Sequence, residues 1–150
     1  MSKIQKILVA LDFSDYSLPT LQYAANLAHD LKASLILVNI FNVRDVRAIQ
    51  TALETYDGDL YQKSIDSRIA ERKSQLAELA MAAEASSLVE KEIVRTDIPY
   101  QGLLQTIKEE KPDLLIMGTK GRGALADTIV GSCAQKMYRR SPVPMLSLRP

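Results

Sequence analysis

The sequence predicts an α/β protein: a doubly wound, five-stranded parallel sheet with helices on both faces. Short, continuously apolar runs alternate along the chain with longer runs whose apolar residues recur at helical spacing. This alternation is typical of crossover units, in which each helix returns the chain to begin the next parallel strand. The 150 residues, 47% of them hydrophobic, are enough for a single domain over residues 1–150 with a core of its own.

The first predicted strand and helix follow one another at the N-terminus. Residues 6–11 (KILVAL) are almost continuously apolar, as expected for a parallel strand that is buried on both faces. Apolar residues then recur at helical spacing over residues 18–31, and Ser17 stands where an N-cap would satisfy the first free amides. Residues 34–40 (SLILVNI) predict a second buried strand.

The middle of the chain predicts an irregular segment, a long helix and an edge strand. Residues 41–60 are mixed and polar, and we expect no regular element there. Helical spacing resumes over about residues 61–85. Residues 87–94 (SLVEKEIV) alternate apolar and charged side chains, which favours the edge of the sheet over its centre.

The last third of the chain predicts two helices and two strands. Residues 97–110 begin with an aspartate that is expected to cap a helix, and residues 113–118 (DLLIMG) form a third buried run. A final helix is predicted over residues 132–140 and a final strand over residues 143–148. Pro144 places this strand at an edge, because proline cannot donate to a ladder.

The expected binding site lies where the strand order reverses. In doubly wound sheets, ligands bind beyond the carboxyl ends of the strands at this point. The two most apolar strands, 6–11 and 113–118, are the expected central neighbours. The loops that follow them, DFSD at 12–15 and GTKGRGALADTIVGS at 118–132, should therefore face one another across the crevice.

The second of these loops has the residues that anion binding requires. Gly118 ends a strand, where the missing side chain lets a ring or sugar lie against the backbone. Gly121 and Gly123 permit a tight loop whose amides point inward as an anion nest. Gly131 and Ser132 open a helix, where free amides and the helix dipole favour a phosphate.

Charged residues at the same place suit a nucleotide. Lys120 and Arg122 flank the loop, and Asp12 follows the first strand, where its carboxylate can accept hydrogen bonds from ribose hydroxyls. The same residues are also compatible with an ordinary turn, solvated charges and a plain N-cap at Ser132. From the residues by themselves, nucleotide binding and an ordinary loop both stay open.

Charge and composition narrow the classes of partner. The net charge of +1 gives no reason to expect a nucleic acid or a membrane surface as partner. The N-terminal apolar run at 7–11 is too short for a signal peptide or a membrane span, so we expect a cytoplasmic protein. Cys133 is the only cysteine, which excludes an intrachain disulfide.

The glycine spacing resembles a known family. The pattern G-x2-G-x9-G-[ST], met by Gly118, Gly121, Gly131 and Ser132, is similar to the ATP-binding signature of the universal stress protein family. The stretches KILVALDFSDYS, DLLIMGTKGRG and SPVPMLSL also resemble that family, and the similarity covers residues 3–149. It implies a five-stranded Rossmann-like fold and a homodimer, commonly paired through the last strand, here 143–148.

The resemblance also implies contacts for the ligand. Asp12 would meet the ribose and adenine region, and Ala10 and Ile40 would line the adenine pocket. Met117 and Gly118 would lie near the sugar. The phosphates would be held, largely through backbone amides, by Gly121, Gly131, Ser132 and Cys133. The implied ligand is ATP, with ADP, AMP or a cyclic nucleotide as alternatives and Mg²⁺ as an optional companion.

Two features depart from the family pattern. Lys120 stands where the family often has histidine, although a side chain there should point outward. The long segment 41–60 is placed to cover or crowd the adenine pocket.

The sequence favours binding or sensing over catalysis. The only histidine, His29, falls near the end of the first helix, away from the glycine loop. The carboxylates near the crevice are Asp12, Asp15 and Asp127, and no P-loop is present. Cys133 has no evident base beside it, so we interpret it as a small packed residue. Slow ATP hydrolysis and a structural dimer with a vestigial site remain as alternatives.

Two enzyme or signalling classes with related topology are disfavoured. A phosphoacceptor receiver domain needs a phosphorylated aspartate after the third strand, where Asp97 is expected to be a helix cap. A nucleotide-transferring enzyme on a related fold would have an SGG or HxGH type of loop after the first strand, where this chain has DFSD.

Overall fold

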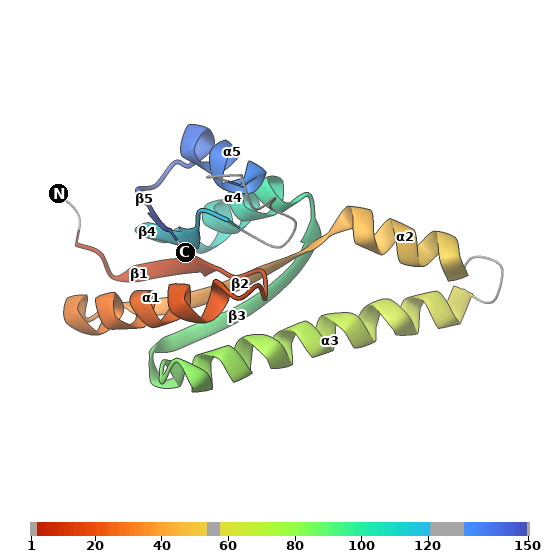
Figure 1. Cartoon of the computed structure of the whole chain (residues 1–150), viewed down its shortest axis with the longest axis horizontal. Coiled ribbons are helices and arrows are strands. Elements are labelled where there is room, and N and C mark those ends of the chain that lie inside the picture. Colours follow the sequence, from red (N-terminus) through yellow and green to blue (C-terminus); the bar gives the residue numbers. More distant parts are fainter. Residues whose placement is uncertain (1–2, 54–57, 121–130, 150) are drawn as a thin grey trace.

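The computed structural model of the chain describes residues 3–53, 58–120 and 131–149. It contains one parallel sheet in the strand order β3-β2-β1-β4-β5, with the reversal between β1 and β4 (Figure 1). The strands are β1 (Lys6–Ala10), β2 (Ser34–Asn42), β3 (Val89–Asp97), β4 (Leu114–Gly118) and β5 (Met145–Leu148). The predicted α/β, Rossmann-like class is confirmed, as are the central pair and the two edge strands.

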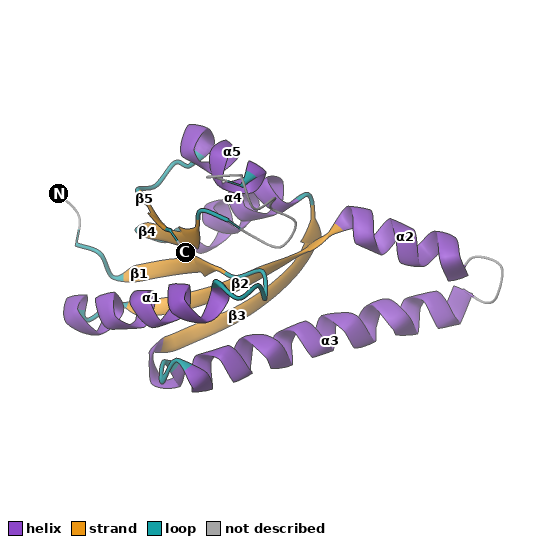
Figure 2. Cartoon of the chain, in the orientation of Figure 1, coloured by secondary structure: helices purple, strands orange, loops and turns teal. Residues whose placement is uncertain are grey.

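Helices cover both faces of the sheet (Figure 2). Side chains of α1 and α3 pack on one face, and those of α4 and α5 pack on the other. The described helices are α1 (Ser17–Leu31), α2 (Val43–Leu53), α3 (Gly58–Ala82), α4 (Pro99–Glu110), α5 (Ser132–Arg140) and the short 3₁₀ turn η1 (Ser86–Leu88). None of these helices is long and apolar enough to cross a bilayer.

Two apolar layers hold this arrangement together, and the central strand β1 contributes to both. Ile7 and Val9 pack against α1 and α3, whereas Leu8 packs against α4 and α5. All three side chains are fully buried. Because successive side chains of a strand point to opposite faces, a strand covered on both sides must be apolar throughout. This explains why residues 7–11 form an uninterrupted apolar run.

The expectation of an irregular segment at residues 41–60 is wrong. β2 continues through Asn42, and α2 follows at once over Val43–Leu53. The helix buries only Val46 among its residues, packing it with Phe41 at the end of β2 and with Ile65 of α3. Most of its other residues are exposed, so the helix contributes little to the core. With α3 it forms a hairpin that projects from the end of the sheet (Figure 1).

Both predicted helix caps are shifted by one residue. Tyr16, not Ser17, is the N-cap of α1, and Ser17 is already helical. Ile98, not Asp97, is the N-cap of α4, because Pro99 at the first helical position forces the preceding residue into extended backbone. The Asp97 carboxylate instead accepts a hydrogen bond from the amide of Ile98 at 2.7 Å.

Candidate functional site

The carboxyl ends of β1 and β4 lie side by side at the centre of the sheet. Ala10 of β1 is in register with Met117 of β4. Both side chains belong to the apolar cluster on the α4 and α5 face, and so does Ile40 from the end of β2. The structure therefore brings together, on one face, the three apolar residues that the family resemblance places around the base and sugar.

Asp12 comes two residues after the end of β1, and the first turn of α1 holds its carboxylate. Its Oδ1 accepts hydrogen bonds from the amide of Ser14 at 3.0 Å and from the hydroxyl of Ser17 at 3.2 Å. These bonds fix the carboxylate at the carboxyl edge of the sheet. The sequence analysis missed this role of Ser17, although the spacing D-x-S-x-x-S (residues 12–17) carries the signal.

Gly118 lies where the backbone of β4 passes close to its surroundings. A Cβ atom at this position would lie 3.2 Å from the carbonyl oxygen of Lys120 and 3.7 Å from Oγ1 of Thr20 in α1. The first distance is tighter than ordinary van der Waals contact, and a carbonyl oxygen cannot rotate away as a side chain can. A larger residue would thus displace the loop that leaves β4.

Thr119 connects the elements around this edge. Its amide donates to the carbonyl oxygen of Leu148 in β5 at 2.9 Å, and its carbonyl oxygen accepts a hydrogen bond from the amide of Gly131. Its side chain is buried, and the hydroxyl has no hydrogen-bond partner within the described part of the chain. Thr119 ties β4 to β5 and to the start of α5, a role that no sequence motif indicated.

The first turn of α5 presents amides without a side-chain cap. Gly131 is the N-cap, Ser132 is exposed, and among the residues that the structure describes no side chain caps this turn. Such amides, together with the helix dipole, favour an anion. Gly131 has φ −69° and ψ 159°, a conformation that any residue adopts. The backbone conformation at this position therefore does not by itself require glycine.

Cys133 follows in the same turn, and its chemistry is that of a packed thiol. Burial raises the pKa of this thiol to about 11; Lys136 opposes the shift, and the negative charge of Asp12 adds to it. The thiol is consequently protonated at neutral pH and is not an activated nucleophile.

The remaining predicted residues lie elsewhere or outside the described part of the chain. Gly121, Gly123, Arg122 and Asp127 fall within residues 121–130, which the structure does not describe. His29 is exposed in the last turn of α1, 3.6 Å from the carboxylate of Asp30, at the opposite end of that helix from Ser17. In the described ranges, no group of three or more His, Cys, Asp or Glu side chains could hold a metal ion.

Segment 41–60 was also expected to cover or crowd the adenine pocket. The apolar contacts of α2 run to Phe41 and to α3. Phe41 and Ile40 are successive residues of a strand, so their side chains point to opposite faces of the sheet. The packing of the described part of this segment is therefore centred on the face opposite Ile40.

The comparisons with known proteins agree on one family. The profile described as "Universal stress protein family" matches residues 3–149. A universal stress protein of Thermus aquaticus is 29% identical over 143 residues, covering 95% of this chain and 97% of its own.

Solved structures show the same fold. The protein MJ0577, a universal stress protein of Methanocaldococcus jannaschii, superposes with a TM-score of 0.80 at 19% identity, covering 99% of this chain and 98% of its own. A universal stress protein solved in complex with cAMP has a TM-score of 0.68 at 23% identity, with the same coverage of both chains. With the profile match over nearly the whole sequence, these results establish that the chain belongs to the universal stress protein family.

Proposed function

We propose that this protein binds an adenine nucleotide, foremost ATP, beyond the carboxyl ends of β1 and β4, and serves in the stress response as a cytoplasmic binding or sensing homodimer. One observation carries the proposal. The carboxylate of Asp12, the bare backbone of Gly118 and the uncapped first turn of α5 all belong to the edge where the strand order reverses. This is where doubly wound sheets bind nucleotides.

Each part of a nucleotide finds matching chemistry at this edge. The Asp12 carboxylate is an acceptor for ribose hydroxyls. Ala10, Ile40 and Met117 offer an apolar surface to the base. The amides at the start of α5, from Ser132 and Cys133, are donors for phosphate oxygens.

The cAMP complex of a related protein supports the adenine class of ligand. ATP shares its base and ribose with cAMP and adds phosphates, which the α5 amides and the glycine signature favour. Mg²⁺ would enter mainly with those phosphates, since it keeps several waters and binds through one or two carboxylates. Asp12 is a carboxylate at the described edge that could contribute to such a site.

The proposed homodimer forms through residues 143–148. β5 lies at one edge of the sheet, and its four residues, Met145–Leu148, carry no charge. An uncharged edge strand has a free row of amides and carbonyls for pairing with a second copy. A two-fold pair of such strands would continue the sheet across the dimer.

The first experiment identifies the ligand. The protein is purified without added nucleotide and denatured, and the supernatant is compared with ATP, ADP and AMP by ion-exchange chromatography, beside calorimetry with ATP. We expect a stoichiometric adenine-nucleotide peak, or heat of binding if the nucleotide is lost on purification. An empty protein that gives no heat with ATP would contradict the proposal.

A substitution at Gly131 then tests the site. Gly131→Val should raise the Kd for ATP at least about 100-fold, or about 2.7 kcal/mol, because its side chain would occupy the space of the phosphates. The φ of −69° accommodates valine, so the fold should persist, which circular dichroism checks. Ser132→Ala is the matched control: it keeps the amides, removes one hydroxyl and should weaken binding by less than about 10-fold. If Gly131→Val binds ATP with unchanged affinity, the phosphates do not bind at this turn.

A further inference from the structure

We propose a second binding site, for a small carboxylate or phosphate metabolite, on the α1 and α3 face of the sheet. A cavity of about 310 Å³ lies there between α3 and the loop that joins β1 to α1. Its lining consists of Phe13, Arg68, Glu71, Arg72 and Gln75. The volume is at the lower end of the range for small-molecule sites, roughly 300–1,000 Å³. None of these residues belongs to the nucleotide site, so this proposal does not depend on that one.

Arg72 is the central residue of the cavity, and the protein holds its guanidinium in place. Nη1 donates a hydrogen bond to Oδ1 of Asn39 at 2.8 Å, and the guanidinium carbon lies 4.0 Å from the centre of the Phe41 ring. The bond fixes the position of the group, and the ring contact adds a cation–π attraction. An exposed arginine on a helix would ordinarily sample many conformations.

Asn39 is a polar side chain that interrupts the apolar run from Leu35 to Phe41 in β2. It is only 2% exposed, and its Nδ2 donates to the carbonyl oxygen of Leu11 at 2.8 Å. Burying an amide costs free energy unless both of its ends are hydrogen-bonded, and here Leu11 and Arg72 serve the two ends. The buried amide therefore acts as the support that positions Arg72 at the cavity wall.

The charges of the lining define the class of ligand. Arg68 lies one helical turn before Arg72, so both guanidinium groups are on the same side of α3. Guanidinium groups bind carboxylate and phosphate oxygens in a forked geometry that matches both. Among the described residues of the lining, Glu71 is the one carboxylate beside two arginines, so these residues together carry a net positive charge. Glu71 and Gln75 would meet a hydroxyl or ammonium group next to the oxyanion of the ligand.

Phe13 closes the cavity on the side of the β1–α1 loop. Its φ of 64° lies in the left-handed region, which is uncommon for a bulky residue. This conformation turns the chain directly after Asp12. As a result, Asp12 lies at the carboxyl edge of the sheet, whereas the next residue, Phe13, lines the cavity. An unfavourable backbone conformation of this kind persists only where its surroundings hold it.

Nuclear magnetic resonance tests the site with defined probes. Labelled protein is titrated with inorganic phosphate, malate and O-phosphoserine at constant ionic strength, following the amides of Phe13 and Gln75 and the Nε–H of Arg72. We expect saturable shifts for at least one probe, and the same affinity in the Gly131→Val variant. Persistence in that variant separates the cavity from the nucleotide site, so failure of either proposal is recognised independently.

Three variants decide the interpretation. Arg72→Gln and Arg68→Gln should each weaken the binding at least about tenfold, or about 1.4 kcal/mol. Arg68 is exposed and belongs to none of the hydrophobic clusters found among the described residues. We therefore expect Arg68→Gln to remain folded even if Arg72→Gln destabilises α3. Arg44→Gln removes a guanidinium that is 82% exposed on α2 and should change nothing. The absence of saturable shifts with all three probes would overturn the proposal, and so would equal effects of all three variants.

Discussion

The two edge strands, β3 and β5, differ in length and in side-chain charge. The longer strand is the one whose charge disfavours pairing with a second copy. β3 extends over nine residues and β5 over only four. The longer edge offers more free backbone groups to a second strand. Its side chains are nevertheless charged at five positions, whereas β5 has none; the five are Glu90, Lys91, Glu92, Arg95 and Asp97.

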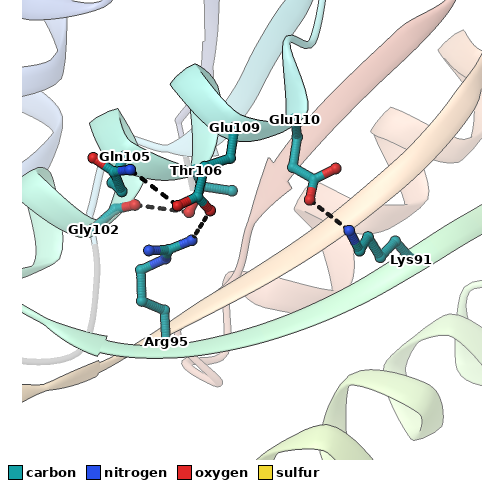
Figure 3. Close-up of polar contacts among 7 residues, drawn as sticks. All are labelled: Lys91, Arg95, Gly102, Gln105, Thr106, Glu109 and Glu110. Carbon is teal, nitrogen blue, oxygen red and sulfur yellow. Dashed lines mark hydrogen bonds and ion pairs between the residues drawn. The ribbon is translucent and has the colours of Figure 1, made fainter.

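The charges of β3 are also engaged by the neighbouring helix. Lys91 Nζ lies 2.7 Å from Oε1 of Glu110, and the guanidinium of Arg95 hydrogen-bonds to Glu109, both on α4 (Figure 3). Gln105 donates a further hydrogen bond to Glu109 at 2.9 Å. A strand added at this edge would have to compete with these ion pairs and remove charged groups from water. Charge on an edge strand is a known protection against such pairing.

β5 is different because its outer side is uncharged and its inner side is well anchored. The carbonyl oxygens of Pro144 and Leu148 accept hydrogen bonds from Leu115 and Thr119. Since the bonding side alternates along a strand, Pro144, Leu146 and Leu148 face β4, and the amide of Ser147 faces outward. The comparison indicates that side-chain charge, more than strand length, decides which edge is available for the proposed dimer.

The largest expected effect comes from Ser147→Pro. Proline removes the outward amide of Ser147 but none of the hydrogen bonds to β4, so pairing with a second copy loses a ladder bond and meets a pyrrolidine ring. The dissociation constant of the dimer should rise at least about 100-fold, or about 2.7 kcal/mol. Analytical ultracentrifugation over a range of concentrations measures this change.

Ser147→Ala is the control for the lost hydroxyl, which contacts the hydroxyl of Tyr138. It keeps the amide and should remain a dimer under the conditions that make Ser147→Pro a monomer. If Ser147→Pro stays dimeric and folded, the interface is not at the β5 edge.

A smaller effect is expected when the charge is removed from the other edge. The double variant Lys91→Val, Glu92→Val loses the ion pair of Lys91 with Glu110. It also turns residues 91–94 of β3 into a run of four apolar side chains. We expect light scattering to report species larger than the dimer, increasing with concentration. Lys73→Val with Glu78→Val, which removes the same charges from exposed positions of α3, should scatter like the wild type. If both double variants behave alike, charge at β3 is not what protects that edge.

The smallest effect concerns Glu109. The hydrogen bond from Gln105, and next the hydrogen bond and charge of Arg95, hold the pKa of the Glu109 carboxyl below its ordinary value. A lowered pKa means that ionised Glu109 stabilises the fold above its unfolded pKa, and that this contribution is lost as the pH falls through the folded value. Gln105→Ala should therefore raise the pKa and reduce the loss of stability on acidification below about pH 4.3.

Carbon NMR titration of the Glu109 carboxyl measures this pKa, with Gln101→Ala on the same helix as the control. An unchanged pKa in Gln105→Ala would show that Arg95, and not Gln105, lowers the pKa of the Glu109 carboxyl.

Much of the fold was predictable because its signals are local. Continuous apolar runs indicated the buried strands, and alternating charge in residues 87–94 indicated an edge. The helix at 43–53 was missed even though Val43, Val46 and Ile49 are spaced three residues apart. It buries only Val46, and the charged and polar residues between the three apolar positions concealed the periodicity.

The candidate site was predictable only in part. The rule that ligands bind at the strand reversal selected the two loops, and the family resemblance selected Ala10 and Met117, which the structure places in register. The support of Asp12 by Ser17 and the position of Thr119 were not predicted. Those contacts depend on how the loops fold back on one another, for which a strand-and-helix pattern contains no information.

The amino-acid sequence by itself predicted the five strands, their parallel arrangement and most of the helices, and it indicated the edge that we propose for a nucleotide. These properties follow from periodicity and glycine spacing within short windows of the chain. Only the tertiary structure decided that Asn39 of β2 supports Arg72 of α3, 33 residues away, beside a cavity on the opposite face. The sequence showed Asn39 as a polar interruption in an apolar strand. Whether such an interruption is satisfied, and by which partner, depends on the packing of distant segments.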